Sequence, residues 1–561
     1  MSTRVLFISN LNHNEASLKK WSVYSPERNL SEIFGSSNIP LGILSIEAYI
    51  KKNCKDVETE ILDLNNEFIK RLIDGDVEKN LVELSASFEA FLKREIEEHI
   101  VKFKPDIIAI SSLFDKSIPT LFKICKIIKE IERNILIIAG GHPVNNLYKD
   151  VLQDCDDTID AISLGEGEIP FSELLNSEDK LTYIQRSNYF ATKEKCLYGQ
   201  KQQLKTTYVE NLDDIPFYDY DTYLAKYGDV ILSFHNNILD NAHSFNKQAV
   251  IMTSRGCPYN CVFCASYTIH SKKMRKHSLE RVKAEVDYFV DKCAVDSIGF
   301  IDDHILFDVD RAIEICDYVG SKKIDFRFPN GLAIAPITKE FVHALERNKV
   351  KEVQLALESG SERVLREIIH KPLTLKLASQ VFDYFKETSI FVRIFLVVGF
   401  PEETKEDILE SLQFLRSANF HWASISSPTP ISGSQLFKQS MENGYLQSFD
   451  YTNISFFSEI FHDQVAENTG FENLRYMFNL DINFVNNPYM RMGKIEAAKE
   501  KFEVILKNYP DHAFALYYLH KCQKQLNEDS SITAQKYNSI IKSNEQWLKY
   551  AKHFNLDLTI S

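Results

Sequence analysis

Short apolar runs alternate with helix-like segments along residues 1–178. The runs are nearly continuous in Val, Ile and Leu, and the segments between them place apolar residues at helical spacing. Strands are predicted at 4–9, 59–64, 105–112, 134–141 and 160–168, and helices at 41–52 and 118–132. Apolar strands separated by helices indicate a parallel sheet covered on both faces. We therefore expect an α/β chain that begins with a Rossmann-like, doubly wound domain, which binds ligands beyond the carboxyl ends of its strands.

Residues 179–247 break this rhythm, because they are polar and aromatic, and we expect a linker with a short hairpin. The alternation resumes over residues 248–436. Six strands are predicted there, at 248–254, 297–302, 325–331, 352–360, 391–401 and 421–430, with a helical segment after each of the first five. This pattern predicts a partial (β/α)6 barrel, whose functional residues lie in loops at the carboxyl ends of the strands.

Residues 437–561 are mostly helical in pattern, and 493–526 resembles one tetratricopeptide helix pair. A single repeat of this type cannot bury its own apolar face, because such solenoids need about three repeats. A helical cap packed on the barrel is therefore favoured over a surface that docks a partner.

The overall charge and hydropathy exclude several classes. The chain of 561 residues is too long for one core, and its formal net charge is −14. No basic stripe is visible, so a nucleic-acid partner is not expected. No apolar run reaches the roughly 18–20 residues that span a bilayer, and the first residues do not resemble a signal peptide. We expect a cytoplasmic protein without a membrane partner.

Three of the ten cysteines stand in one short stretch, TSRGCPYNCVFCAS, with the spacing C-x3-C-x2-C. Cys125 and Cys316 lie on apolar helical faces and are predicted to be core residues. Three thiolates crowded into one loop require a metal, because bare thiolates repel one another and oxidise.

Zinc and an iron–sulfur cluster are the two candidates for this metal. A structural zinc site takes four protein ligands, and His270 is the nearest fourth candidate. Zinc loops usually pair C-x2-C with a second, distant pair, which this chain lacks. An iron–sulfur cluster takes four thiolates, so three would leave one iron open to another ligand.

The C-x3-C-x2-C stretch, with Phe263 before its last cysteine, resembles the signature of the radical S-adenosylmethionine (SAM) superfamily. The resemblance implies a [4Fe-4S] cluster on Cys257, Cys261 and Cys264, with SAM chelating the fourth iron. One electron would then cleave SAM to methionine and a 5′-deoxyadenosyl radical.

Three later stretches, FIDDHILFD, LALESGSERVL and FLVVGFPEET, resemble strand-end motifs of the same superfamily. The SAM contacts that they and the signature imply are Phe263, Asp302, Asp303, Glu358, Ser359, Val397 and Gly399. Asp302 and Asp303 replace the Gly-Gly-Glu that is frequent in the family, Glu402 keeps the fifth-strand motif, and Phe395 replaces its first glycine. Taken singly, the acids could be helix caps and the glycine a turn residue.

The first domain lacks G-x-G-x-x-G, so a dinucleotide is not indicated. Its strand ends instead resemble the S-x-L, G-G and glycine-turn elements of cobalamin-binding domains. The cobalamin contacts implied are Ser111, Ser112, Leu113, Gly140, Gly141, Gly165, Glu166 and Gly167. The D-x-H-x-x-G element is missing, since Asn10 and Asn12 stand in the Asp and His places and His13 is off register. The resemblance therefore implies cobalamin without a protein histidine below the metal.

Together these features predict a cobalamin-dependent radical SAM enzyme that methylates an unactivated carbon. The alternatives are a non-methylating member that oxidises, cyclises or rearranges a metabolite, and a non-catalytic corrinoid sensor or carrier. The last would not need the three cysteines together with Asp302 and Glu358. The expected partners are a small-molecule or carrier-bound substrate and an electron donor such as flavodoxin or ferredoxin. The sequence points to no residue that acts on the substrate.

Overall fold

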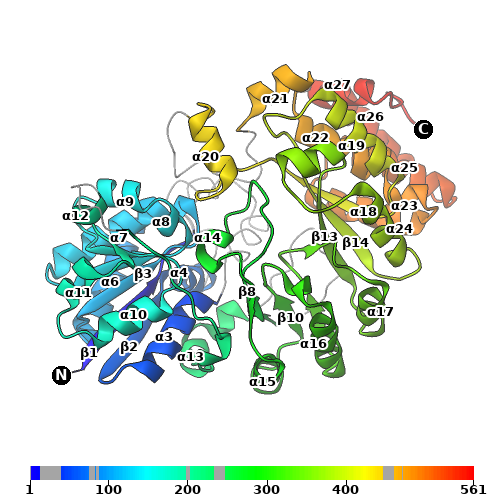
Figure 1. The fold of residues 1–561 in the computed structure, drawn as a ribbon. Helices are drawn as coiled ribbons and strands as arrows, with labels where there is room; N and C mark the ends of the chain where they lie inside the picture. The colour runs from blue at the N-terminus through cyan, green and yellow to red at the C-terminus, as the bar shows by residue number, and fades with distance from the viewer. Residues whose placement is uncertain are drawn as a thin grey trace.

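The computed structural model describes residues 2–12, 39–74, 83, 87–196, 203–232, 247–446, 460–470 and 472–561. Figure 1 shows three groups of elements that follow one another along the chain: a blue and cyan sheet with its helices, a green and yellow set of strands and helices, and an orange and red helical group.

The first group is a six-stranded sheet in the order β2-β1-β3-β4-β5-β6. Its strands are β1 (Thr3–Ser9), β2 (Val57–Asp63), β3 (Ile107–Ser111), β4 (Leu136–Gly140), β5 (Ala161–Ser163) and β6 (Phe190–Ala191). The five strands predicted from the apolar runs are confirmed, and they pair in parallel. β6 is antiparallel to β5 and comes from the stretch predicted as a linker. That stretch therefore extends the first sheet.

Helices cover both faces of this sheet. They are α3 (Leu41–Asn53), α4 (Leu64–Ile73), α6 (Phe88–Phe103), α7 (Ile118–Ile131), α8 (His142–Asn146), α9 (Tyr148–Asp154), α10 (Glu168–Asn176), α11 (Lys180–Arg186), α12 (Lys193–Cys196) and α13 (Tyr220–Ile231). Val5 and Phe7 share a buried cluster with residues of α3 and α10, whereas Leu6 and Ile8 share one with residues of α4, α6 and α7. Successive strand side chains point to opposite faces, so the four central residues of β1, Val5–Ile8, are all apolar because the strand is buried on both sides.

The second group contains two parallel sheets, β11-β10-β7 and β12-β13-β14-β15, and a small antiparallel hairpin of β8 and β9. The strands are β7 (Gln248–Ile251), β8 (Ser254–Arg255), β9 (Arg275–Lys276), β10 (Ser297–Phe300), β11 (Asp325–Arg327), β12 (Leu332–Ala333), β13 (Glu352–Glu358), β14 (Phe391–Val397) and β15 (Trp422–Ser426). The helices are α14 (Tyr267–His270), α15 (Leu279–Asp287), α16 (Val309–Ser321), α17 (Lys339–Arg347), α18 (Leu375–Phe385), α19 (Lys405–Ser417) and α20 (Gln435–Glu442). All six predicted strands are present. β8, β9 and β12 were not predicted, because two residues carry no periodicity.

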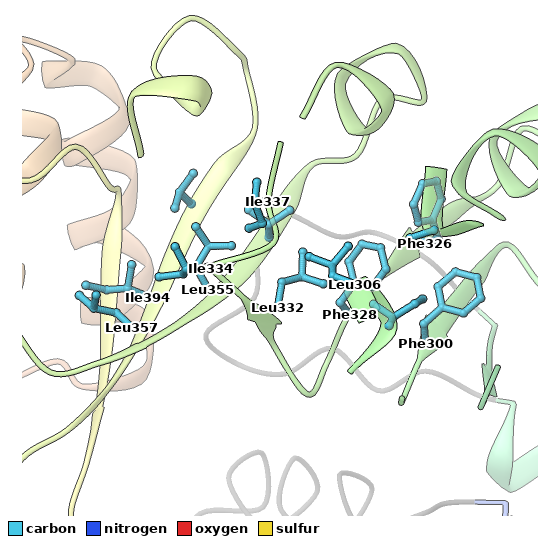
Figure 2. Close-up of a cluster of buried hydrophobic side chains, with 14 of the residues drawn as sticks. Phe300, Leu306, Phe326, Phe328, Leu332, Ile334, Ile337, Leu355, Leu357 and Ile394 are labelled. Carbon is cyan, nitrogen blue, oxygen red and sulfur yellow. The ribbon is translucent and has the colours of Figure 1, made fainter. Parts of the chain in front are cut away.

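One apolar core joins the two parallel sheets (Figure 2). Phe300 of β10 and Phe328, just after β11, have their rings stacked 5.9 Å apart. Leu355 of β13 and Ile394 of β14 belong to the same buried cluster. The sheets therefore form a single wall around shared side chains, as expected for a partial barrel.

The third group is a helical stack. Its helices are α21 (His462–Thr469), α22 (Leu474–Leu480), α23 (Pro488–Arg491), α24 (Ile495–Asn508), α25 (Ala513–Gln525), α26 (Ser531–Ser543) and α27 (Glu545–His553). In this stack, α21 and α22 pack buried residues into the barrel core, whereas α24–α27 share a separate core. Phe484, Phe502, Phe514 and Tyr537 are buried together, and Trp422 of β15 contacts Phe484 at a ring distance of 6.1 Å. The predicted helix pair is thus α24 and α25, continued by α26 and α27. Within the described ranges, no helix has the length and apolarity to cross a bilayer.

Candidate active site

The three clustered cysteines lie in the loop that joins β8 to β9, beside α14. All three are free of disulfides and half-buried. The loop is pinned in its middle, because the Val262 N–H donates to the Ile369 carbonyl at 2.9 Å and the Val262 carbonyl accepts from the Leu436 N–H at 2.8 Å. Backbone bonds to two other elements hold the loop in place without using the thiols, which leaves all three for ligation.

The thiols suit a cluster whose irons each take one cysteine. Burial, together with the neighbouring thiols, raises the pKa of Cys257 to about 11 and that of Cys261 to about 12. Metal binding must therefore release protons from these side chains. Across the described residues, no three His, Cys, Asp or Glu side chains converge on a single ion, whereas a [4Fe-4S] cluster spreads its thiolates over separate irons.

Asp302 and Asp303 follow β10, as predicted, but their carboxylates have different surroundings. Asp302 is buried and accepts from the Thr253 N–H at 3.1 Å, the Thr253 hydroxyl at 2.8 Å and the Ser254 hydroxyl at 2.6 Å. Its carboxylate is thus committed to the chain just before the cysteine loop. Asp303 is half-buried and accepts from the Gly256 N–H at 3.3 Å, so it is the acid of the pair that borders the loop directly.

Glu358 ends β13 in a left-handed conformation, with φ of 71°, next to an irregularity in the strand register. Such strain is uncommon outside glycine and gathers at functional sites. Its carboxylate binds the buried Lys371 ammonium at 2.9 Å. Burial lowers the pKa of Lys371, but Glu358 and Cys261 outweigh this and raise it. No sequence pattern pointed to Lys371, whose charge adjoins both a predicted SAM contact, Glu358, and a predicted cluster ligand, Cys261.

Ser359 turns away from the loop, since its hydroxyl accepts from the Ser361 N–H at 3.2 Å and lies 3.4 Å from the Ser411 hydroxyl on α19. Phe263, in contrast, lies at the fifth-strand end, where its ring is 6.4 Å from that of Phe400. Val397 is the last residue of β14. The structure thus brings the cysteine loop to the end of β14 but directs Ser359 into the helix layer.

The turn after β14 is held by Glu403, not by the residue that the motif indicated. Glu402 is exposed, whereas Glu403 is buried and accepts from the Gly399 N–H at 2.5 Å and the Phe400 N–H at 2.8 Å. Both bonds end on Oε2, so the other oxygen can hold a proton. Burial raises the pKa of Glu403 to about 7, against the opposing effect of these bonds.

The free energy of unfolding should fall as the pH rises through the titration of the Glu403 carboxyl group. The folded-state pKa of Glu403 is about 7 against an ordinary 4.5, so the folded chain keeps a proton that the unfolded chain releases. The contribution is complete below pH 4.5 and is lost toward pH 7, a change of about 3 kcal/mol in the free energy of unfolding. The free energy of unfolding, measured with urea at several pH values in this range, should therefore depend less on pH in Glu403→Gln. The variant of the exposed neighbour, Glu402→Gln, should keep the wild-type pH dependence. Equal pH dependence in the two variants would contradict this assignment.

A pocket of about 310 Å³, a volume that includes space open to solvent, lies at the carboxyl ends of β14 and β15. Gly399 and Pro428 form its barrel side, and Val465 and Leu474 close it from α21 and α22. The lining also contains Val398, Ser427, Ile460, Phe461, His462, Asn473 and Arg475. The buried Ser427 hydroxyl has no hydrogen-bond partner among the described residues. This pocket is mostly apolar with a few polar groups, as is usual for small-molecule sites.

A second cleft, of about 410 Å³ including space open to solvent, lies at the carboxyl edge of the first sheet. Its lining consists of Phe7, Ile43, Ile46, Ala109, Ile110, Ser111, Ile138, Ala139, Gly140, Gly141, Ser163, Gly165, Gly167 and Phe171. Ser111 and the four glycines were all predicted cobalamin contacts. The buried Ser163 hydroxyl lacks a hydrogen-bond partner within the described chain. An apolar cleft with backbone-lined walls and one spare hydroxyl fits a cobalamin nucleotide tail.

Three predicted cobalamin contacts do not line this cleft. Leu113 is 52% exposed. Ser112 is buried, and its hydroxyl accepts from Asn10 Nδ2 at 2.9 Å. Glu166 directs its carboxylate at Arg275 and His270 of the cysteine hairpin, at 2.7 and 2.9 Å. Sequence spacing located the strand ends correctly, but the direction of each side chain depends on tertiary contacts.

Asn10, which stands in the Asp place of the missing lower-ligand motif, is buried and its side chain ties β1 to the end of β3 and the start of the next helix. Its Nδ2 donates to Ser112 Oγ and to the Ser117 carbonyl, both at 2.9 Å, and its Oδ1 accepts from the Leu11 N–H at 2.8 Å. Asn12 is held through its N–H by Asn65 Oδ1 at 3.1 Å. His13 lies outside the described residues.

Asn10→Ala should destabilise the first domain by about 1–3 kcal/mol, because it leaves buried donors and acceptors unpaired. The midpoint and slope of urea unfolding give this difference. Asn53→Ala is the matched control, since the Asn53 amide bonds the Tyr49 carbonyl on the surface and should change stability by less than about 0.5 kcal/mol. Equal midpoints for the two variants would contradict a stabilising role for the buried hydrogen bonds of Asn10.

Two protein-family models match the chain. The model of the radical SAM superfamily covers residues 251–415, and that of the B12 binding domain covers residues 34–175. The matched ranges contain the cysteine loop and most of the cobalamin cleft. The radical SAM domain holds [4Fe-4S] and SAM, and the B12 binding domain holds cobalamin.

Curated relatives match over most of the chain. An uncharacterized methyltransferase of Pyrococcus horikoshii is 26% identical over 76% of this chain and 83% of its own length. Cytidylyl-2-hydroxyethylphosphonate methyltransferase of Streptomyces wedmorensis is 27% identical, over 72% and 78%. Anaerobic magnesium-protoporphyrin IX monomethyl ester cyclase of Rubrivivax gelatinosus is 22% identical, over 65% and 63%.

A solved structure shares the whole arrangement of elements. The cobalamin-dependent SAM radical enzyme OxsB, with aqua-cobalamin and SAM bound, aligns with a TM-score of 0.63 at 13% identity, over 98% of this chain and 80% of OxsB. The fold is thus shared despite low sequence similarity. The chain belongs to the radical SAM superfamily, and the B12-binding domain that precedes its radical SAM domain makes it a cobalamin-dependent member.

Proposed function

We propose that this enzyme transfers a methyl group from SAM, by way of cobalamin, to an unactivated carbon of its substrate. The observation that carries the proposal is the contact between the turn after β5, which lines the cobalamin cleft, and the hairpin that holds the cysteines. A methyl carrier and a radical source must act on one carbon, so their sites must adjoin. The similarity to two methyltransferases over more than two thirds of the chain supports it.

The protein's share of the chemistry is to bind, orient and exclude water. When bound, the cluster supplies the electron that cleaves SAM, and cobalamin carries the methyl group. Cys257, Cys261 and Cys264 would hold the cluster. The opposite charges of Glu358 and Lys371 suit the amino and carboxylate ends of the methionyl group. The glycine turn after β14 would receive the adenosyl end.

The substrate would occupy the pocket between the ends of β14 and β15 and helices α21 and α22. Its walls are apolar, and its polar groups include the Ser427 hydroxyl and Arg475. These groups suit a small-molecule or carrier-bound substrate with an apolar body and a hydrogen-bond acceptor. A flavodoxin or ferredoxin would supply electrons.

The proposed reaction fixes a product ratio. One C–H bond breaks, and its hydrogen atom passes to the deoxyadenosyl group; one C–CH₃ bond forms. Each turnover consumes two molecules of SAM and two electrons, and releases methionine, 5′-deoxyadenosine and S-adenosylhomocysteine. One electron cleaves SAM and the other restores the corrinoid.

The test uses the full chain reconstituted anaerobically with iron, sulfide and hydroxocobalamin. Reduced enzyme and methyl-deuterated SAM, without substrate, should form about one S-adenosylhomocysteine per corrin. Added extract of low-mass metabolites should then yield a compound that carries the deuterated methyl group, together with 5′-deoxyadenosine. Deoxyadenosine without S-adenosylhomocysteine would rule out methyl transfer.

That outcome would favour the second candidate, a cyclisation or another rearrangement without methylation. The observation behind it is the similarity to the anaerobic cyclase over 65% of the chain. The same incubation separates the two, because a cyclase product would lose hydrogen without gaining the label.

A further inference from the structure

Two acids of the first domain and two arginines of the cysteine hairpin form a buried ionic network. Arg275 donates to both oxygens of Glu166, at 2.7 and 2.8 Å. Arg255 donates to Glu168 at 2.8 Å and lies 3.3 Å from Glu166. His270 Nδ1 completes the set, 2.9 Å from Glu166 Oε1. The network thus crosses the boundary between the two cofactor-holding domains.

The four charged residues are at most 5% exposed, and the two carboxylates balance the two guanidinium groups. Burial raises the pKa of Glu166, but the nearby Arg255, Arg275 and His270 outweigh this and lower it, so the carboxylate stays charged. Removing such ions from water offsets most of their attraction, and an apolar replacement is often as stable. Their attested use is to fix one arrangement over others, and the paired N–H···O bonds of Arg275 fix direction as well as distance.

The members of the network adjoin both cofactor sites. Glu166 stands between Gly165 and Gly167, which line the cobalamin cleft. Arg255 is two residues before Cys257, and Arg275 stands on the other strand of the hairpin that encloses the cysteine loop. The ion pairs therefore join two short stretches of chain, one that lines the cobalamin cleft and one that carries the cysteines.

We propose that Glu166, Glu168, Arg255 and Arg275 are positioning residues that set the separation and orientation of the corrin relative to the cluster. The network acts through the glycine turn on one side and the cysteine loop on the other, and it touches neither reacting atom. Its effect on methyl transfer rests on the proposed function, whereas its effect on cofactor geometry does not.

Glu166→Gln tests this role, because it keeps the size of the side chain and removes its charge. Glu166→Asp keeps the charge and shortens the reach. Glu95→Gln is the matched control, because Glu95 is a buried acid of the same domain whose carboxylate pairs with Arg71 at 2.5 Å and Arg94 at 3.2 Å, both in the first domain. All three are made in the full chain and loaded with both cofactors.

The first readout is magnetic and needs no substrate. A reduced cluster speeds the electron-spin relaxation of cob(II)alamin, and the effect falls steeply with distance. In wild type and Glu95→Gln, the reduced cluster should increase the relaxation rate of cob(II)alamin by a single, uniform amount. Glu166→Gln should show a weaker or heterogeneous enhancement at unchanged iron and corrin content, and Glu166→Asp an intermediate one.

The second readout is the number of methyl groups transferred per 5′-deoxyadenosine. A displacement of about 1 Å can cost about 10²-fold in rate, so Glu166→Gln should lower this ratio by up to that factor while still cleaving SAM. If the relaxation rate of cob(II)alamin is the same in Glu166→Gln and Glu95→Gln, the proposal is overturned. If Glu166→Gln does not fold, Arg275→Lys, which keeps the charge but loses the paired bonds, replaces it under the same criteria. If no variant or wild type transfers methyl groups, the proposed function fails, and the relaxation data still decide the positioning role.

Discussion

Cys261→Ser should abolish SAM cleavage and reduce the iron content of the reconstituted enzyme from about four atoms per chain to near zero. Serine is a poor ligand for cluster iron, and the structure offers no replacement thiol in the loop, because the loop between β8 and β9 holds only the three cysteines of the motif. Iron and sulfide content, the visible absorbance of the cluster and chromatographic detection of 5′-deoxyadenosine measure the effect.

Cys54→Ser is the control for this variant. Cys54 is also half-buried and free, but it lies in the first domain, 3.6 Å from the Ser172 carbonyl. Its replacement should leave iron content and SAM cleavage at the wild-type level. A Cys261→Ser enzyme that keeps its iron would refute the assignment of this loop as the cluster site.

Gly141→Ala should eliminate corrin retention. Gly141 has φ of 92°, and a Cβ there would lie 2.1 Å from the Ser112 carbonyl oxygen. The obstacle is backbone, so no rotamer change relieves it. The Ser112 N–H also donates to the Gly140 carbonyl at 3.0 Å, so relief of the clash must separate the ends of β3 and β4, where the cobalamin cleft lies. Corrin content after gel filtration, read from its absorbance, measures the loss.

Gly444→Ala isolates the conformational part of this effect. Gly444 has φ of 73°, but nothing lies within 4 Å of a Cβ at that position. We expect it to cost only the left-handed preference, about 1–2 kcal/mol in the free energy of unfolding, with normal corrin content. Gly141→Ala should cost more than this. Equal corrin retention in the two variants would show that the β3–β4 edge does not shape the cofactor site.

The strands and the cysteine loop could be predicted because their signals are local. A strand buried on both faces is apolar at every position, and a cluster motif is compact in sequence. β6 was missed because a two-residue edge strand carries no such pattern. The helix pair α24–α25 was recognised, and α26 and α27 lie in the stretch predicted to be mostly helical, although their bounds were not predicted.

Side-chain direction at the site was less predictable, because contacts with distant segments decide it. Glu402 and Glu403 are adjacent, and only the packing of the turn makes Glu403 the buried acid. Glu166 was predicted to contact cobalamin, yet its charge is drawn to Arg275, which lies 109 positions further along the chain. Lys371 precedes a proline in an unremarkable stretch, and it gains significance only beside Glu358.

The separate core of the helical stack has a consequence for how the enzyme unfolds. Its aromatic cluster around Phe484 and Phe502 shares no buried member with the barrel core, and Arg416 on α19 pairs with Asp481 at the boundary. Elements with independent cores open as separate cooperative units. Amide hydrogen exchange should therefore show α24–α27 protected to a different free energy from β13 and β14. Opening of this unit alone would expose the aromatic cluster around Phe484 and Phe502 while the two cofactor-holding domains stay folded.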